Sequence, residues 1–253
     1  MSEKKYLADP KKRFSSRVEN YITYRPSYPL KIIDFLKEKN VLTRDTVIAD
    51  IGSGTGILTK MFLKNENQVY GIEPNKDMRT AAERILQKYT NFSSIDGSAE
   101  FTGLEDDSID LIIAGQAFHW FDVEEAKREF KRILKPNGNV ALIWNNRGKV
   151  GSDFNNEYEA FVSKYGIDYK EIRKNERNVE QFFNYQKETF DNFQELDFAS
   201  FKGRVLSVSY IPLADNPIFP KMILELEDLF NKHQKNGIIR IEYNTELYYG
   251  KLE

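Results

Sequence analysis

Between residues 46 and 150, the hydrophobic and polar positions follow two alternating patterns. Short, nearly continuous apolar runs are typical of buried strands, and stretches with apolar residues every three or four positions are typical of amphipathic helices. This βαβ order implies a parallel sheet covered by helices on both faces. The apolar runs predict strands at 46–51, 68–73, 92–97, 109–117 and 139–146. The periodic stretches predict helices at 57–65, 75–89 and 123–135, the last stopped by Pro136-Asn137-Gly138.

The pattern changes after residue 150. Residues 153–166 and 219–237 have helical periodicity, and the second of these helices is expected to end at Gly237. Residues 184–197 predict a strand with its flanks, and 238–252 predict one or two strands that close the sheet. The sequence contains no repeat, low-complexity block or flexible linker, so we predict a single domain over residues 1–253.

Composition narrows the chemistry that the chain can perform. It has no cysteine and only two histidines, His119 and His233, which lie far apart in the sequence. Thiolate nucleophiles and disulfides are thereby excluded, and a histidine-based metal centre is not expected. We therefore predict no metal site and expect an organic cofactor to supply the reactive group.

Charge and hydropathy bear on partners and location. Charged residues make up 30% of the chain, the net charge is -2 and the sequence pI is about 5.9, so no global basic field favours nucleic acid. The first twenty residues lack the apolar core of a signal peptide, and no window offers about 18 uncharged apolar residues. We expect a cytoplasmic monomer or homodimer with no nucleic-acid or membrane partner.

The stretch VIADIGSGTGILTK, residues 47–60, places three glycines in five positions between an expected strand and an expected helix. Such turns lie at the carboxyl edge of a parallel sheet, where nucleotide-like ligands bind. Asp50 precedes the turn, and Glu73 closes the next strand in GIEPN. An acidic side chain at the end of that strand is placed to accept hydrogen bonds from a ribose diol.

Two cofactors fit a site of this kind. A dinucleotide fingerprint is GxGxxG, but here the third glycine falls one residue early and Ile57 stands in its place. S-adenosylmethionine carries no phosphate; it needs the ribose-binding acid, room for its methionine end and an acid that orients its ammonium group. Asp50 is available for that last task, directly or through water.

Four successive motifs carry a family resemblance: VIADIGSGTG, GIEPN, DGSAEFTGLEDDSIDLIIAGQAFHWFD and ILKPNGNVALIWNNR. In this order and spacing they resemble the motifs of class I S-adenosylmethionine-dependent methyltransferases, specifically the type-11-like group that includes trans-aconitate methyltransferase-like enzymes. RFSSRVENYITYRPSYP and FKGRVLSVSYIP are similar to that group as well, so the resemblance covers nearly the whole chain.

The resemblance implies a Rossmann-like α/β fold, a three-layer αβα sandwich with a seven-stranded, mostly parallel sheet whose last strand is antiparallel. It further implies an amino-terminal lid at 1–36, a cofactor-binding core at 40–150, and remaining strands with a helical cap at 151–253. The cap would combine the amino-terminal segment with the helices around 200–236.

The resemblance also implies cofactor contacts. The glycines would shape the loop around the methionine part, Glu73 would bind the ribose, residues 97–100 would lie against the adenine, and 116–118 would face the transfer site. Many relatives carry an aspartate where this chain has Ser98. The implied cofactor residues are Asp50, Gly52, Ser53, Gly54, Gly56, Glu73, Pro74, Asn75, Gly97, Ser98, Ala99, Glu100, Gln116, Ala117 and Phe118.

Methyl transfer is an in-line displacement for which the protein supplies alignment rather than a nucleophile. A carboxylate acceptor needs no general base, whereas a hydroxyl or amine acceptor does. His119 is the one histidine near the expected transfer site; it could act as that base, pack against the following helix or line the pocket. The expected substrate-side residues are Tyr21, Tyr24, Arg25, Trp120 and Arg147.

We therefore predict that the chain binds S-adenosylmethionine, releases S-adenosylhomocysteine, and methylates a small molecule, with an oxygen of a carboxylic acid as the favoured acceptor. Three alternatives remain open at this stage. They are an RNA or protein methyltransferase, a binding module that keeps the cofactor site without catalysis, and an NAD-dependent oxidoreductase.

Overall fold

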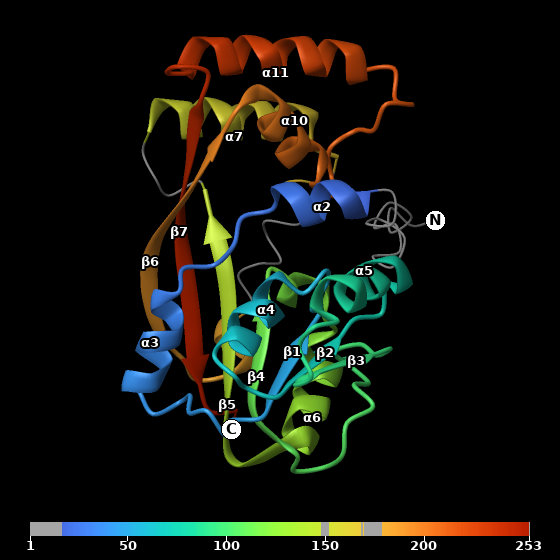
Figure 1. Ribbon diagram of the computed structural model, residues 1–253, viewed down its shortest axis with the longest axis vertical. Coiled ribbons are helices and arrows are strands. Elements are labelled where there is room, and N and C mark those ends of the chain that lie inside the picture. Colours follow the sequence, from blue (N-terminus) through green and yellow to red (C-terminus); the bar gives the residue numbers. More distant parts are fainter. Residues whose placement is uncertain (1–16, 148–151, 168, 170–178, 253) are drawn as a thin grey trace.

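A computed structural model of the chain describes residues 17–147, 152–167, 169 and 179–252. Seven strands form one sheet in the order β3-β2-β1-β4-β5-β7-β6 (Figure 1). Strand β7 runs antiparallel to both of its neighbours, and all the other pairs are parallel. The predicted sheet is thus confirmed. The strands are β1 Ile48–Ile51, β2 Val69–Ile72, β3 Phe92–Ile95, β4 Ile109–Gly115, β5 Leu134–Asn146, β6 Gln186–Leu196 and β7 Ile239–Gly250.

Helices connect these strands and extend beyond the sheet. Within the described ranges, none of them is both long and apolar enough to span a membrane. The helices are α2 Val18–Tyr24, α3 Lys31–Glu38, α4 Ile57–Lys64, α5 Lys76–Leu86, the 3-10 turn η3 Phe118–Trp120, α6 Val123–Ile133, α7 Asp153–Tyr165, α9 Val179–Phe182, α10 Phe198–Leu206 and α11 Phe219–His233.

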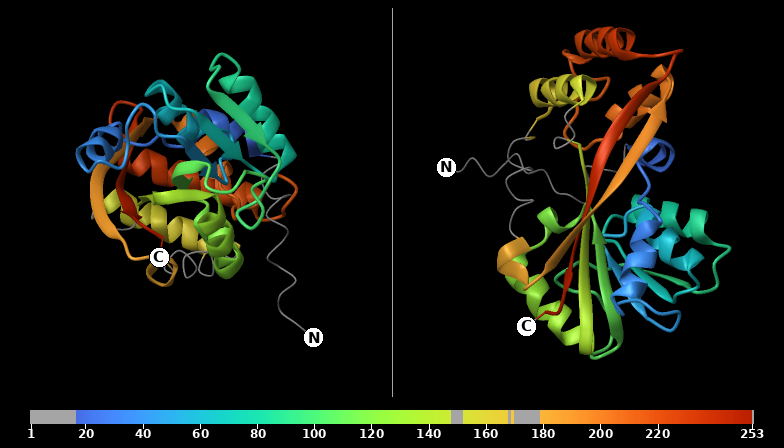
Figure 2. Two further views of the ribbon diagram at one scale, coloured as in Figure 1. Left: turned by 90° about the horizontal axis from the view of Figure 1, so that it is seen from below. Right: turned by 90° about the vertical axis from the view of Figure 1, so that its left-hand side faces the viewer.

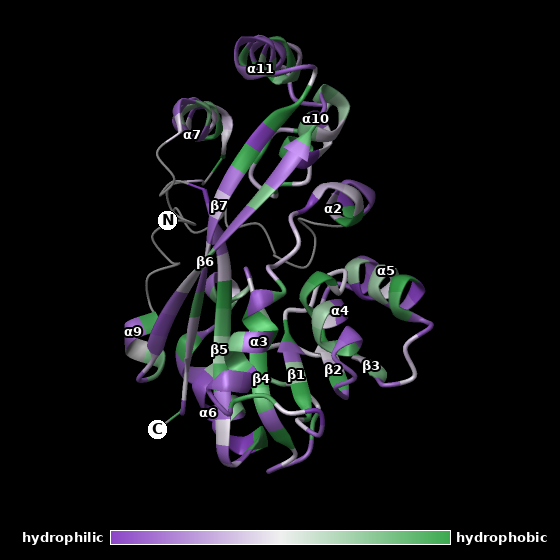
Figure 3. Ribbon diagram, turned by 60° about the vertical axis from the view of Figure 1, so that its left-hand side comes forward, coloured by the Kyte–Doolittle hydropathy of each residue, from purple (hydrophilic) through white to green (hydrophobic). Residues whose placement is uncertain are grey.

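The central strands are apolar on both faces because helices cover both sides. In β4, Leu111 and Ile113 pack in a cluster with residues of α3, α4 and α5. The alternate residues Ile112 and Ala114 pack on the other face in a cluster with α6 and α9. Figure 3 shows the consequence, since β1 and β4 are largely hydrophobic whereas the edge strand β6 is largely hydrophilic. This is the three-layer arrangement expected from the sequence.

Strands β6 and β7 extend past the ends of β1, β2 and β3, and a second group of helices packs against their far end. Ile241 and Tyr243 of β7, which still pair with β6, are buried against α7, α10 and α11. The right-hand view of Figure 2 shows the two strands running from the α/β core to these helices. We call α7, α10 and α11 the cap helices.

Helix α2 lies between the core and the cap helices (Figure 1). It packs on α10 so closely that a Cβ atom added to Gly203 would lie 2.1 Å from the Tyr24 ring. The Arg17 guanidinium donates hydrogen bonds to the Leu206 and Ile211 carbonyls at 2.8 and 2.5 Å. The amino-terminal segment from residue 17 onward is therefore fixed to the cap. Residues 1–16 of the predicted lid lie outside the described residues.

Three predicted helix ends were wrong. Helix α5 ends at Leu86 rather than at Tyr89. Helix α6 ends at Ile133 rather than at Lys135, because Leu134 already pairs with Ile109 of β4, and the Pro-Asn-Gly sequence lies inside β5. Helix α11 ends at His233 instead of reaching Gly237. The residues that follow form a reverse turn, in which Asn236 and Gly237 have positive φ and Lys235 bridges Ile238.

Candidate active site

The turn between β1 and α4 has the backbone shape that glycine allows. Gly52, Gly54 and Gly56 have φ values of 70°, 57° and 82°. Residues other than glycine rarely adopt this left-handed region of the backbone. A Cβ atom on Gly52 would lie 2.6 Å from Cβ of Ala117, and one on Gly56 would lie 2.6 Å from Cδ1 of Leu86. The turn therefore approaches both the segment after β4 and helix α5 through its backbone.

Glu73, at the end of β2, braces this turn. Its two carboxylate oxygens accept hydrogen bonds from the Gly54 and Asn75 N–H groups, each at 2.8 Å. The residue is only 8% exposed. Burial raises the pKa of Glu73, and these two hydrogen bonds oppose that shift. The carboxylate thus closes the turn and also faces the adjoining cavity.

This first cavity lies along the carboxyl edge of β1, β2 and β4. We call it the ribose-side cavity after the ribose-binding role that the sequence predicts for Glu73. Met78, Ala99 and Phe121 give it apolar walls, with the Glu73 carboxylate among them. Most of the predicted cofactor residues line it: Gly52, Gly54, Glu73, Pro74, Ser98, Ala99, Glu100, Gln116 and Ala117.

The other predicted cofactor residues lie elsewhere. Asp50 and Ser53 line a second, adjacent cavity. Asn75 caps α5, its side chain accepting from the Asp77 and Met78 N–H groups. A Cβ on Gly97 would lie 2.9 Å from the Thr102 carbonyl oxygen. Gly56, Asn75, Gly97 and Phe118 are not among the lining residues of either cavity.

Phe118 was predicted to face the transfer site, but its side chain is buried in the core. Its ring is 1% exposed and packs edge-on against Phe182, with the centroids 4.9 Å apart. The 3-10 turn η3 places Phe118 toward the core, whereas His119 and Trp120 line the second cavity. Tyr24 also lines neither cavity, since its ring lies on Gly203 of α10.

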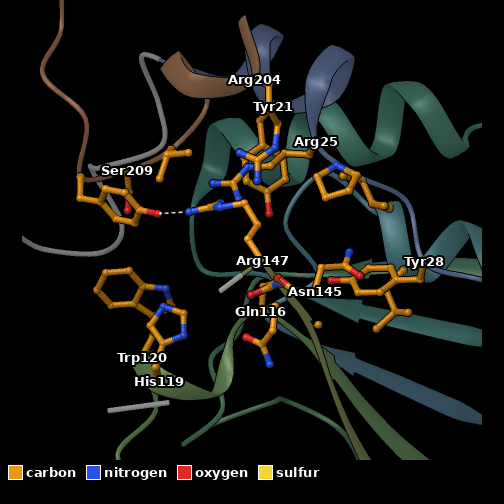
Figure 4. A pocket seen from close by; sticks show the side chains of 18 of the residues that line it. Tyr21, Arg25, Tyr28, Gln116, His119, Trp120, Asn145, Arg147, Arg204 and Ser209 are labelled. Atoms are coloured by element: carbon orange, nitrogen blue, oxygen red, sulfur yellow. Dashed lines mark hydrogen bonds between the residues drawn. The ribbon is translucent and has the colours of Figure 1, made fainter. Parts of the chain in front are cut away.

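The second cavity, which we call the arginine-side cavity, adjoins the ribose-side cavity. The two share the lining residues Tyr21, Gly52, Gly115, Gln116 and Trp120. Figure 4 shows its side chains, with Arg25 from the end of α2, Arg147 after β5 and His119 from η3 around one space. The structure thereby brings together four predicted substrate-side residues, Tyr21, Arg25, Trp120 and Arg147.

Asp50 is the acidic group of the arginine-side cavity nearest the glycine turn. It is 1% exposed, and its Oδ2 accepts a hydrogen bond from the Thr59 hydroxyl at 2.6 Å. Its Oδ1 has no hydrogen-bond partner among the described residues. Burial raises the pKa of Asp50 to about 7; the Thr59 hydrogen bonds oppose the shift, and the negative charge of Glu73 adds to it. The site therefore holds a carboxyl group that titrates near neutral pH.

His119 lines the same cavity as Asp50 and carries no charge at neutral pH. Burial lowers its pKa to about 4, and the positive charge of Arg25 lowers it as well. Its ring lies beside Trp120, with centroids 4.8 Å apart, and its Nδ1 has no hydrogen-bond partner within the described ranges. The neutral imidazole is thus a weakly basic wall of the cavity.

Sequence reasoning missed Arg204 of α10, which lines the arginine-side cavity and is only 2% exposed. A signal was present: Arg204 stands three residues after Phe201 and directly before Val205, on the apolar face of the helix. A charged residue in such a position is rarely buried unless it has a partner. Asn145 also lines the cavity and was missed.

Residues 49–142 match a family model described as "Methyltransferase domain". Of the curated relatives, an uncharacterized methyltransferase-like protein of Schizosaccharomyces pombe is 34% identical over 54% of this chain and 52% of its own length. CRG1 of Saccharomyces cerevisiae, named a probable S-adenosylmethionine-dependent methyltransferase, is 30% identical over 49% and 43%. These matches span about half the length of the relatives or less.

The fold has solved counterparts over most of the chain. A protein of Anaeromyxobacter dehalogenans assigned as a type II methyltransferase has a TM-score of 0.72 at 18% identity, covering 90% of this chain and 98% of its own. YcgJ of Bacillus subtilis has a TM-score of 0.52 at 22% identity, covering 87% and 98%. At these identities the likeness concerns the fold.

The raised pKa of Asp50 predicts a pH-dependent stability. The folded chain holds this proton up to about pH 7, whereas an unfolded aspartate releases it near 3.8, so the free energy of unfolding falls as pH rises between these values. Asp50→Asn keeps an oxygen for Thr59 and has no proton to lose. Its stability relative to wild type should rise by about 2–3 kcal/mol between pH 5 and pH 8.

Urea denaturation at the two pH values measures this difference. Asp45→Asn, which removes an exposed carboxylate before β1, is the matched control. Parallel losses of stability in wild type and Asp50→Asn between pH 5 and pH 8 would show that Asp50 is not the titrating group.

Proposed function

We propose that this chain, whose residues 49–142 match a methyltransferase-domain model, is a class I enzyme that uses S-adenosylmethionine to methylate a carboxylate oxygen of a small molecule. The observation that carries the proposal is the pair of adjoining cavities. One has a strand-end carboxylate and apolar walls, the other has buried arginines, and they meet at Gln116 and Trp120.

The residues of the ribose-side cavity fit S-adenosylmethionine, the cofactor of this class of domain. Glu73 would accept hydrogen bonds from the ribose hydroxyls, and Met78, Ala99 and Phe121 would pack against the adenine. The free Oδ1 of Asp50 is an acceptor suited to the ammonium group of the methionine part. When bound, the cofactor supplies a methyl group on a sulfonium, which passes to the acceptor oxygen while the bonding electron pair stays on sulfur.

The arginine-side cavity supports an anionic acceptor. Arg25 and Arg147 line it, and each has a buried Nε with no hydrogen-bond partner among the described residues. An arginine N–H group binds a carboxylate more strongly than it binds a neutral acceptor. These two side chains would hold the acceptor and orient one of its oxygens toward the junction of the cavities.

The state of His119 favours a carboxylate over a hydroxyl or amine. A carboxylate is already deprotonated and needs no general base, whereas a base is most effective when its pKa lies near the working pH. A buried imidazole with a pKa of about 4 is far below that range. We therefore assign His119 to the cavity wall.

The amino-terminal segment would cover the reaction. Tyr21 of α2 lines both cavities, and Arg25 follows directly after this helix. Two amide side chains, of Asn192 and Gln194 in β6, donate to the Ser27 and Tyr24 carbonyls at 2.8 and 3.0 Å. We propose that this segment acts as a lid that excludes water from the junction during transfer.

Glu73→Ala should weaken the binding of S-adenosylhomocysteine by about 1–3 kcal/mol, because the ribose would lose its acceptor and two N–H groups of the turn would lose theirs. Isothermal calorimetry measures the change, with thermal melting as the test of folding. Glu105→Ala, which removes an exposed glutamate after β3, is the control. Equal affinity in wild type and Glu73→Ala would remove Glu73 from the cofactor site.

Transfer of a labelled methyl group from S-adenosylmethionine to a panel of carboxylic acids, phenols and amines tests the acceptor class. We expect products among the carboxylic acids, and His119→Ala should keep turnover within about tenfold of wild type, since loss of a general base costs about 10²–10⁴-fold. Cofactor affinity should stay unchanged in this variant. Products confined to phenols or amines, with turnover abolished by His119→Ala, would contradict the proposal.

A further inference from the structure

Three arginine side chains from three separate elements meet at the arginine-side cavity: Arg25 after α2, Arg147 after β5 and Arg204 in α10. Arg204 is 2% exposed, and the side chain of Arg147 is 11% exposed. Figure 4 shows Arg204 and Arg25 across the space from Gln116 and His119, with Arg147 between them. Three positive charges thus face one cavity.

Among the described residues that line the arginine-side cavity, few acidic groups compensate the positive charge of the three arginines. Glu159 lies 3.6 Å from Arg147, and Asp50 stands beside the glycine turn. Burial lowers the pKa of Arg25, and the positive charges of Arg204 and Arg147 lower it further. Buried like charges persist only where the surrounding fold holds them in place, and an anion that binds between them relieves the repulsion.

Several buried nitrogens of these arginines have no hydrogen-bond partner among the described residues, which also favours a bound anion. Arg204 has two buried nitrogens without a partner among the described residues, Nε and Nη1, and Arg25 and Arg147 have one each, the Nε. A buried N–H group without an acceptor is costly, and such groups in a native structure call for an explanation. Oxygen atoms of a bound anion would satisfy all of them.

One carboxylate is too small to do so while it is methylated. One of its oxygens must face the methyl donor at the Gln116 junction, on the far side of the cavity from Arg204. The two buried N–H donors of Arg204 then remain for a different group. Its chemistry is that of an oxyanion, because guanidinium groups pair best with planar carboxylates and with phosphate oxygens.

We propose that Arg204 forms a second anion subsite beside the place where Arg25 and Arg147 hold the reacting carboxylate, and that the acceptor carries an oxyanion group in addition to the carboxylate that is methylated. This inference rests on the proposed function for the identity of the first group. Arg204 is the specificity-determining residue of the subsite, since its helix contributes nothing else that is charged to the cavity.

Three probes of equal backbone length test the subsite: butyrate, succinate and 3-phosphonopropionate, which differ in having a methyl, a carboxylate or a phosphonate at the far end. Calorimetry with the wild-type protein and S-adenosylhomocysteine should show that at least one of the two doubly anionic probes binds about tenfold or more tightly than butyrate. The preferred probe identifies the oxyanion. The same titrations without S-adenosylhomocysteine test the subsite independently of the cofactor.

Arg204→Met should reduce the preference for the doubly anionic probe to about threefold or less, while Arg204→Lys, which keeps the charge, should retain part of it. Arg44→Met, at a side chain 76% exposed, is the matched control and should keep the full preference. Thermal melting reports whether each variant folds.

Equal binding of the three probes to the wild type would overturn the inference without recourse to any variant. An unchanged preference in folded Arg204→Met would also overturn it. Failure of S-adenosylhomocysteine to bind, with the probe preference intact, would instead count against the proposed function and leave the anion subsite standing.

Discussion

The structure depends on the close approach of the backbone of the glycine turn after β1 to neighbouring side chains. Gly52 leaves no room for a side chain between β1 and the segment after β4, and Gly56 leaves none between the turn and α5. Because these contacts fix the turn, its N–H groups lie within reach of the strand-end carboxylate of Glu73. The same contacts leave a cavity on each side of the turn, both lined by Gly52 and Gln116.

The second constraint is the long ribbon of β6 and β7. Strands β1, β2 and β3 are short, but β6 and β7 extend past them toward the cap helices. There the side chains of Ile241 and Tyr243 in β7 are buried beneath the cap helices. The cap is therefore tied to the core by continuous backbone pairing. The arginines that face the site come from three different places in the fold, after α2, after β5 and in α10.

Much of this could be read from the sequence, for physical reasons. Buried parallel strands give nearly continuous apolar runs, so Ile48–Ile51 and Ile109–Gly115 were predicted within a few residues. Glycines before a helix and an acid at the next strand end give local signals that need no tertiary information. Both sets of residues lie at the ribose-side cavity or its turn.

What sequence reasoning missed depends on side-chain direction and distant contacts. Phe118 and His119 are neighbours, but the 3-10 turn sends one ring into the core and the other into the cavity. Leu134 looked helical because its pairing partner Ile109 is remote in the chain. Arg204 was missed because its signal in the sequence is only a charge on an apolar helix face. Its proposed role depends on the packing between α10 and α2, which the sequence does not display.

We propose above all that the glycine turn serves S-adenosylmethionine rather than a dinucleotide. The most direct measurement is isothermal calorimetry of the purified protein with S-adenosylhomocysteine, run beside NAD under the same conditions. The account predicts a dissociation constant for S-adenosylhomocysteine of about micromolar and no detectable heat with NAD. Binding of NAD alone would contradict it, and every role assigned to Asp50, Glu73 and the adjoining cavities would fall with that result.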